Sequence, residues 1–321
     1  MRELLAASRR HSYWYVLLLA VALLIANIAV LPNFASPSGL VVTLAEFAPI
    51  ALIAMANTPA ILSGGGGIDI SVAATMNLVN VLYVAVLLPR GLGGAGVSAV
   101  LLLLLGGGIG ACNGIMVAVL RYQPVIATIA SFFIIDGVSL AIATTPVSAG
   151  PNWTDHLAGF PWPLLLIGLP LAGWAVLRRT AYVRNLLLLG ADPPAAFSAG
   201  IDTRVISISA YALGGVIAAI AGIALTTVLR SADSSLALQY ALIGVASVAI
   251  GGTALSGGRG GMTGSLLGAM TLYLLQNLLG ELRISQNWVQ LAYGFVLVAA
   301  VLASSGLARR PTNTAVGGTT A

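Results

Sequence analysis

The sequence predicts an all-α membrane protein, a polytopic bundle of about ten transmembrane helices. Two observations predict this fold. Of the 321 residues 59% are hydrophobic and only 7% are charged, and the 14 basic residues are all arginines that stand mostly at the ends of long apolar runs. Because lipid offers backbone groups no hydrogen bonds, each run must form a helix, and about 20 apolar residues cross a hydrocarbon layer of roughly 30 Å.

Apolar runs follow one another along the whole chain. We expect membrane-spanning helices at residues 14–31, 40–62, 68–88, 95–120, 124–145, 161–177, 205–229, 238–255, 262–279 and 288–304. The first run follows Arg2, Arg9 and Arg10, as in a signal peptide. It lacks a clear small-residue cleavage site and leads into further spans, so we expect it to be retained.

The arginines orient the bundle. With the amino terminus inside, eleven arginines lie on the cytoplasmic side and three, Arg90, Arg230 and Arg283, lie outside, as the positive-inside rule requires. We therefore expect ten spans with both termini in the cytoplasm. Residues 1–310 are expected to form one transmembrane domain with a longer cytoplasmic loop at 178–204. The tail 311–321 has no periodicity, and we expect it to be disordered.

Missing residue types exclude several kinds of chemistry. Without lysine the chain cannot build a P-loop, a kinase site or a lysine Schiff base. Histidine is limited to His11 and His156 and cysteine to Cys112, so clustered metal ligands and an intrachain disulfide are excluded. The LSGGR segment at 255–259 looks like an ABC ATPase signature, but that motif works only beside a phosphate-binding lysine. We expect a cytoplasmic turn there, no catalysis, no bound cofactor and no nucleic-acid partner.

Two acidic residues, Glu46 and Asp136, fall inside the expected spans. Charges at such depth are rare and normally face protein or a water-filled cavity. Asp136 is therefore a candidate for lining a cavity. Alternatively, it is a protonated carboxyl bonded to a neighbouring helix, or it pairs with an arginine.

The second span contains Pro49 and Pro59, with Asn57 between them. Proline frees backbone groups from the helix ladder, which predicts a broken helix that can bind a ligand. A kink that serves only packing is the alternative. Glu46 and Asn57 are eleven residues apart, close to three turns, so they project from about the same face of the helix.

Other polar residues lie in or beside the spans. Asp69 and Ser71 follow a run of four glycines and are expected in the first turn of a helix. Polar residues also repeat at helical spacing in the third and ninth spans, where they either line a pathway or join helices. The candidate pathway residues are Glu46, Asn57, Asp69, Asn77, Asn80, Asp136, Tyr273, Gln276 and Asn277.

Small residues recur every four positions in three of the spans. This spacing lets helix backbones approach closely and predicts tight packing there. The series are Gly106, Gly110 and Gly114; Gly214, Ala218 and Gly222; and Gly264 and Gly268.

Four segments carry a resemblance to a known family. They are GGGGIDIS, GACNGIMVAVLRYQPVIATIASFFIIDG, LLGADPPAAFSAGID and IGGTALSGGRGGMTGSLLGAM. In that order they resemble the ribose-type permeases of bacterial ABC importers, from about the second span to the tenth. Two positions depart from the family pattern: Asp136 stands where an arginine is usual, and Gln276 where the first of two asparagines is common.

The resemblance implies a subunit of the bacterial plasma membrane that moves a small polar solute, a monosaccharide or related polyol. It implies three partners: a cytoplasmic ABC ATPase that binds ATP and magnesium, a periplasmic or lipid-anchored solute-binding protein, and a second permease subunit, either a copy or a paralogue. Selectivity in such systems resides largely in the soluble receptor, so the sequence leaves the substrate open.

The resemblance also implies that the loop 178–204 couples the permease to the ATPase. Asp192 and the prolines can start a short helix and Gly200 can end it, and closure of the ATPases would push this helix and rock the bundle. The matching residues are Gly190, Ala191, Asp192, Pro193, Ala195, Ala196, Ser198, Gly200 and Ile201.

A secondary transporter is the alternative function. It would use Asp136 or Glu46 as a proton relay or ion site and would need no ATPase. A membrane enzyme is disfavoured because the sequence has no histidine cluster, nucleophile elbow or metal-ligand set.

Overall fold

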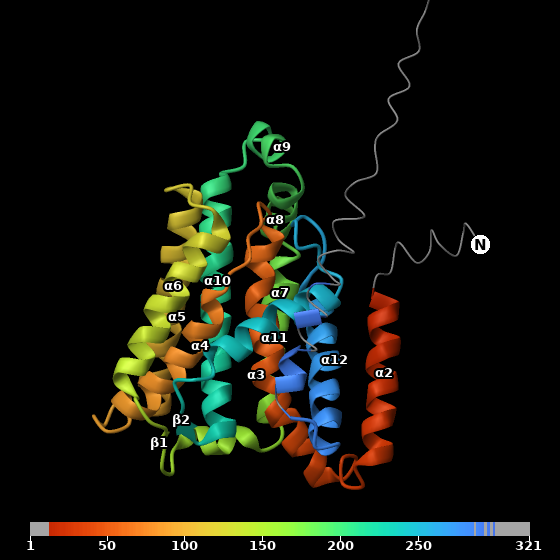
Figure 1. The fold of residues 1–321 in the computed structure, drawn as a ribbon. Helices are drawn as coiled ribbons and strands as arrows, with labels where there is room; N and C mark the ends of the chain where they lie inside the picture. Colours follow the sequence, from red (N-terminus) through yellow and green to blue (C-terminus); the bar gives the residue numbers. More distant parts are fainter. Residues whose placement is uncertain (1–12, 286, 292–293, 296–297, 299–321) are drawn as a thin grey trace, which may run out of the picture.

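Nearly every element of the computed structural model is a helix (Figure 1). The structure describes residues 13–285, 287–291, 294–295 and 298. The helices are α2 (Tyr13–Val30), α3 (Pro37–Leu62), α4 (Ser71–Leu82), η1 (Tyr83–Leu87), α5 (Ala95–Ala118), α6 (Pro124–Ile142), η2 (Trp153–Ala158), α7 (Trp162–Leu177), α8 (Ala181–Ala191), α9 (Pro193–Ser198), α10 (Thr203–Leu229), α11 (Ala237–Ile250) and α12 (Met262–Glu281). Two short strands, β1 (Val147–Ser148) and β2 (Ser231–Ala232), pair antiparallel.

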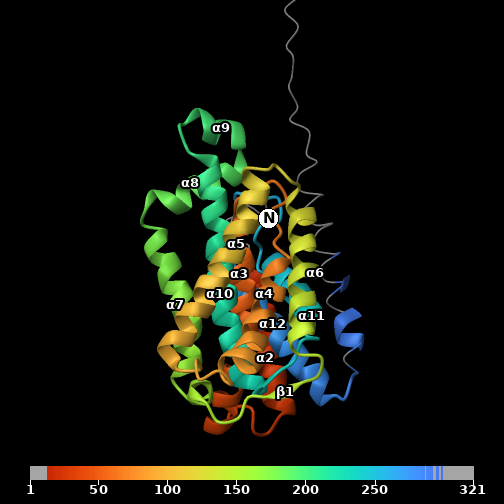
Figure 2. The ribbon, with the colours of Figure 1, turned by 90° about the vertical axis from the view of Figure 1, so that its left-hand side faces the viewer.

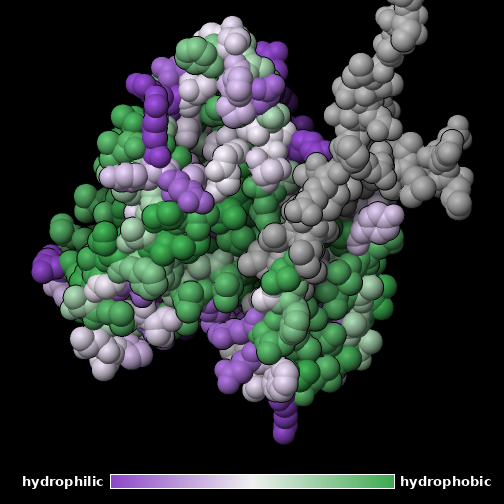
Figure 3. Space-filling model, turned by 45° about the horizontal axis from the view of Figure 1, so that its top comes forward, coloured by the Kyte–Doolittle hydropathy of each residue, from purple (hydrophilic) through white to green (hydrophobic). Residues whose placement is uncertain are grey.

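Helices α3 and α10 form the centre of the bundle. In the most apolar stretch of each helix, 72% of the residues of α10 and 56% of those of α3 are buried, whereas only 28% are buried in α5 and in α6. The outer helices therefore present apolar side chains to their surroundings, as lipid-facing helices do. Figure 3 shows this apolar flank below the more polar end that carries α9.

Local sequence signals set the helix ends. Ser36 accepts a 3.1 Å hydrogen bond from the amide of Gly39 at the start of α3, and Pro37 occupies the first turn, where its missing amide costs nothing. Asp202 starts α10 by accepting bonds from the amides of Arg204 and Val205, both 3.1 Å long. These caps lie where the apolar runs begin.

The small-residue series pack as predicted. A methyl group at Gly106 would overlap the carbonyl oxygen of Gly215, and one at Gly110 would overlap that of Tyr211, so α5 lies directly against α10. Gly268 on α12 meets the carbonyl oxygen of Ser247 on α11 in the same way. Only glycine permits this backbone contact.

Two predictions about the second and third spans were wrong. Helix α3 is not broken: it continues through Pro49 and Pro59 to Leu62, so the prolines act within a continuous helix. The third helix starts at Ser71 and not at residue 68, because the glycines at 64–66 adopt positive φ and keep the chain in a loop. After Leu82 it continues as the π-helix η1.

The polar segment 178–204 contains more helix than expected. Helix α8 bends away from α7 by 85° and buries Val183, Leu186 and Leu189. The sequence predicted one short helix here, because the arginines around these leucines made the segment look like a loop. Helix α9 then stands at the far end of the bundle (Figures 1 and 2).

The opposite end of the bundle is covered by β1, β2 and η2 (Figure 1). Asn152 and Asp155 form a capping box at the start of η2, and the Tyr83 hydroxyl lies 3.1 Å from the side-chain oxygen of Asn152. Asp155 also pairs with Arg230 at 3.7 Å. This end is held together by polar contacts between three connections that are distant in sequence.

Four described helices, α3, α5, α6 and α10, are long and apolar enough to cross a membrane, and the bent pair α7–α8 adds a fifth if it counts as one span. Helices α2, α4 with η1, and α11 are shorter apolar helices. Of the expected span 288–304, the described residues are helical, and the remainder lies outside the described part, as does the tail 311–321. The expected number of ten spans therefore stays a prediction.

Candidate translocation and coupling sites

Helix α9 has the start and end that the sequence predicted. The Asp192 carboxylate accepts a 3.0 Å bond from the amide of Ala195, Pro193 follows in the first turn, and Gly200 just beyond the end has φ of 76°. Ala196 is fully buried, while Phe197 on the outer surface is 75% exposed. The helix thus presents a large aromatic side chain at the end of the bundle, where a partner can contact it.

Gly190, just before α9, belongs to a contact that we call the glycine junction. It consists of Gly64 in the connection after α3, Gly190 at the end of α8, and Gly257 and Gly258 in the connection before α12. A methyl group at Gly190 would overlap the carbonyl oxygen of Leu62, and one at Gly257 would overlap the Cα of Gly64. The amide of Gly258 donates a 3.2 Å hydrogen bond to the same Leu62 oxygen. The three segments therefore touch through their backbones.

Asp69 lies at the other end of the glycine loop, only 1% exposed. One carboxylate oxygen, Oδ1, accepts bonds from the Ser71 amide at 3.0 Å and from its hydroxyl at 2.6 Å. Asn113 on α5 donates to the Ser71 hydroxyl and accepts from Ser131 on α6. This chain of bonds ties the loop to α4, α5 and α6.

Two atoms beside this network have no partner among the described residues. They are Oδ2 of Asp69 and the hydroxyl of Tyr211, which is fully buried on α10. Burial of a polar atom without a partner is costly.

Asn77 and Asn80 are buried and join helices. The Asn80 amide donates 2.9 Å bonds to the Thr226 hydroxyl and to the Ser231 carbonyl oxygen, and the Asn77 amide donates a 3.0 Å bond to the carbonyl oxygen of Ser234. Both therefore connect α4 to the α10–α11 connection. This geometry fits the helix-joining alternative better than an open pathway.

Glu46 and Asn57 do not share a surface. Glu46 is exposed and accepts a 3.1 Å bond from the Tyr273 hydroxyl on α12. Asn57 is buried, donates to the carbonyl oxygen of Ile53 in its own helix, and faces Gly244 on α11. Glu46 therefore meets α12, whereas Asn57 meets α11.

Asn277 joins α12 to α2. Its amide donates a 3.2 Å bond to the side-chain oxygen of Asn27, whose own amide bonds the carbonyl oxygen of Leu274 at 2.9 Å. The neighbouring Gln276 is half-buried. Asn277, one of the polar residues predicted in the ninth span, therefore joins two helices. Its partner on α2, Asn27, was not predicted from the sequence.

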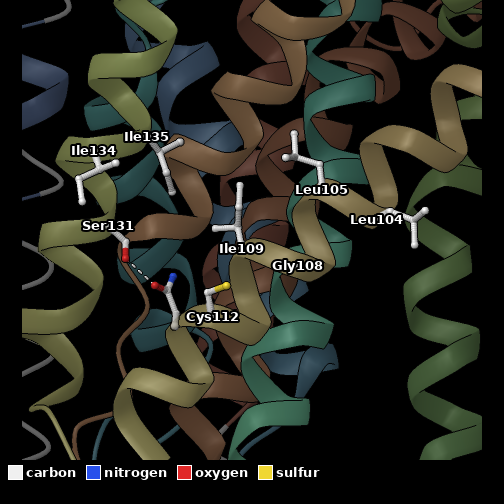
Figure 4. Close-up of a pocket in the computed structure, with 9 residues that line it drawn as sticks. Leu104, Leu105, Gly108, Ile109, Cys112, Ser131, Ile134 and Ile135 are labelled. Atoms are coloured by element: carbon white, nitrogen blue, oxygen red, sulfur yellow. Dashed lines mark hydrogen bonds between the residues drawn. The ribbon is translucent and has the colours of Figure 1, made fainter. Parts of the chain in front are cut away.

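Asp136 is half-buried on α6, and no described residue forms a hydrogen bond or ion pair with it. On the same helix, an open pocket of about 470 Å³ lies between α5 and α6 (Figure 4). Its walls are mostly apolar, and its polar end is the bonded pair Asn113 and Ser131. The lining residues are Leu104, Leu105, Gly108, Ile109, Cys112, Asn113, Ser131, Ile134 and Ile135.

The predicted pathway residues therefore occupy several separate places and do not meet at one site. Sequence reasoning missed Asn27, Asn113 and Tyr211, all buried. The sequence held a signal for Asn27 and Asn113, because an asparagine inside an apolar run is costly unless it forms hydrogen bonds. For Tyr211 the signal was weak, because a tyrosine is common in membrane helices.

The apolar flank and the long apolar helices define a multi-pass membrane protein. The chain matches the family described as "Branched-chain amino acid transport system / permease component" over residues 39–301, and it belongs to this family. No solved structure matches it.

Named relatives cover most of the chain. The ribose import permease protein RbsC of Escherichia coli (strain K12) is 32% identical over 301 residues, 89% of this chain and 91% of its own. The RbsC of Bacillus subtilis (strain 168) is 32% identical over 284 residues, 84% and 86%. The galactofuranose transporter permease protein YtfT of Escherichia coli (strain K12) is 35% identical over 235 residues, 70% and 67%.

Proposed function

We propose that this chain is the membrane-spanning permease subunit of an ATP-driven importer, and that it forms the translocation pathway for a sugar or related polyol. The observation that carries the proposal is the similarity to ribose and galactofuranose permeases over most of the chain. It is supported by α9, which stands out from one end of the bundle with an exposed aromatic residue, as a docking element for another subunit must.

We propose ten spans in the bacterial inner membrane, with both termini and α9 in the cytoplasm. Helix α2 runs away from the end that carries α9 and finishes beside the start of α3 (Figure 1), which supports this topology. The arginines of the segment 178–204 lie at that end too, as the positive-inside rule requires. The opposite end, covered by β1, β2 and η2, then faces the solute-binding protein.

In this proposal three partners complete the importer. A cytoplasmic ATPase binds ATP and magnesium and receives α9, while a solute-binding protein delivers the solute from outside. A second permease subunit completes the pathway. Asp136 is half-buried and unbonded by the described residues, so it is one pathway candidate whose side chain can meet a solute.

The polar groups of the spans are compatible with a sugar. Neither a positively charged side chain nor a second charge of opposite sign is needed to bind a neutral polyol. The described spans offer two carboxylates together with amides and hydroxyls, and the described arginines lie at helix ends, in connections or, for Arg184, within α8. Neutral donors and acceptors suit the hydroxyl groups of a sugar.

The alternative, a secondary transporter that uses Asp136 or Glu46, is not favoured. Glu46 is exposed and already bonded to Tyr273, so it is not a buried ion site. Family membership also favours a permease subunit driven by a partner.

Co-purification with the partner ABC ATPase tests the proposal. We expect the wild-type chain and Gly173→Ala, which adds a methyl group in open space on α7, to retain the ATPase. The double variant Asp192→Ala with Gly200→Ala should lose it, because it removes the start and the end of α9. Full retention of the ATPase and of ATP-dependent uptake by the double variant would contradict the coupling role.

A further inference from the structure

The glycine junction lies between two parts of the molecule that the proposed function requires to move together. On one side is α9, which begins three residues after Gly190. On the other side is the loop 63–70, which begins directly after α3 and carries Asp69. Through the junction, the coupling segment contacts this loop in the folded bundle.

The junction is suited to transmit displacement because it contains no side chains. Gly190 meets the carbonyl oxygen of Leu62 and the amide of Gly258, and Gly64 meets the Cα and carbonyl oxygen of Gly190. The bond from Gly258 to Leu62 fixes the third segment to the same oxygen. Side-chain contacts can yield by rotation, whereas a backbone contact must move with the segments themselves.

The loop beyond the junction has open space around two of its glycines. Gly64, Gly65 and Gly66 all adopt positive φ, and positions 65 and 66 have open space where a side chain would stand. The loop is then tied down again at Asp69, through Ser71 and Asn113. A displacement at Gly64 therefore acts on the buried carboxylate of Asp69, whose second oxygen has no described partner.

We propose that the glycine junction is the contact through which α9 moves the loop 63–70, and that this loop is the inner gate of the pathway. Gly190 is then a positioning residue for transport, because it acts on the gate through Leu62 and Gly64. The inference rests on the proposed function, since it assumes that a partner ATPase displaces α9.

The test uses the purified transporter complex and the variant Gly190→Ala. Gly190 does not adopt a positive φ, so alanine adds only a methyl group, which collides with the carbonyl oxygen of Leu62. We expect the complex to assemble, because Gly190 lies on α8 and not on α9, and we expect uptake per ATP hydrolysed to fall about tenfold. The control Gly173→Ala, with open space at the same methyl group, should transport normally. Unchanged uptake per ATP in Gly190→Ala would overturn the inference.

A second measurement decides the matter even if Gly190→Ala fails to assemble. Ser63 is only 8% exposed, so in a Cys112→Ser background the variant Ser63→Cys reports whether the loop opens. We expect its rate of labelling by a thiol reagent to change when the complex binds ATP. A labelling rate that does not depend on ATP would overturn the gate assignment. If the wild-type complex shows no ATP-dependent uptake at all, the proposed function itself fails, which is a distinguishable outcome.

Discussion

Asn80 on α4 donates a 2.9 Å hydrogen bond to the hydroxyl of Thr226 on α10. The same amide bonds the carbonyl oxygen of Ser231, and the side chain is fully buried. This one side chain thus joins α4 both to α10 and to the α10–α11 connection. Its role in joining helices gives a direct prediction.

Replacement Asn80→Ala should lower the free energy of unfolding by about 1 to 3 kcal/mol, because it leaves buried groups without partners. Thermal unfolding in detergent measures this loss, with the exposed Asn33→Ala as the control. Uptake per folded molecule should be nearly unchanged. A stable variant with strongly reduced uptake would instead place Asn80 in the pathway.

Replacement of Asn113 by aspartate should destabilise the protein more than replacement by alanine. Asn113→Ala loses the bonds to Ser71 and Ser131, at a cost of about 1 to 3 kcal/mol. Asn113→Asp also removes the donor but adds a second buried carboxylate near Asp69, so unfolding should occur at a lower temperature than in the alanine variant. The neighbouring Cys112→Ser changes an exposed side chain and should be neutral. Equal stability of all three variants would contradict the network.

Phe197→Ala should weaken ATPase binding without unfolding the permease. The ring is 75% exposed, so the folded chain loses little when it is removed. An aromatic residue at the centre of an interface often contributes more than 1 kcal/mol, so affinity should fall by about tenfold. Titration of the ATPase onto the permease in nanodiscs measures the affinity. Unaltered affinity would mean that the ATPase contacts another part of the chain.

Asp136→Asn should reduce uptake while the complex still assembles. The carboxylate is half-buried in α6 and no described residue bonds it, so removal of its charge costs the fold nothing. Gly137→Ala beside it adds a methyl group in open space and serves as the control. Normal uptake by Asp136→Asn would remove this residue from the pathway.

Much of the fold was readable from the sequence because lipid imposes simple rules. The bounds of α5, α6 and α10 lie within a few residues of the predicted ones, since long apolar runs leave few alternatives. Asp192 and Gly200 marked the ends of α9 through local capping chemistry that needs no knowledge of the rest of the fold.

Other features depend on contacts that sequence patterns do not reveal. Helix α8 turns by 85° so that Leu186 reaches the core, although the arginines around it indicated a loop. The bond between Asn113 and Ser71 exists only because α4 and α5 meet there. The same limit applies to Gly64 and Gly190, whose contact connects residues from two distant segments.

The most direct test of the account is uptake by proteoliposomes that contain the permease, its ATPase and its solute-binding protein. The account predicts that a labelled sugar accumulates in the proteoliposomes only when ATP is present on the side of the membrane that carries the ATPase. Unlabelled sugars should compete with this uptake, and leucine should not. Sugar uptake that continues without the ATPase, and that follows an imposed proton gradient, would contradict it.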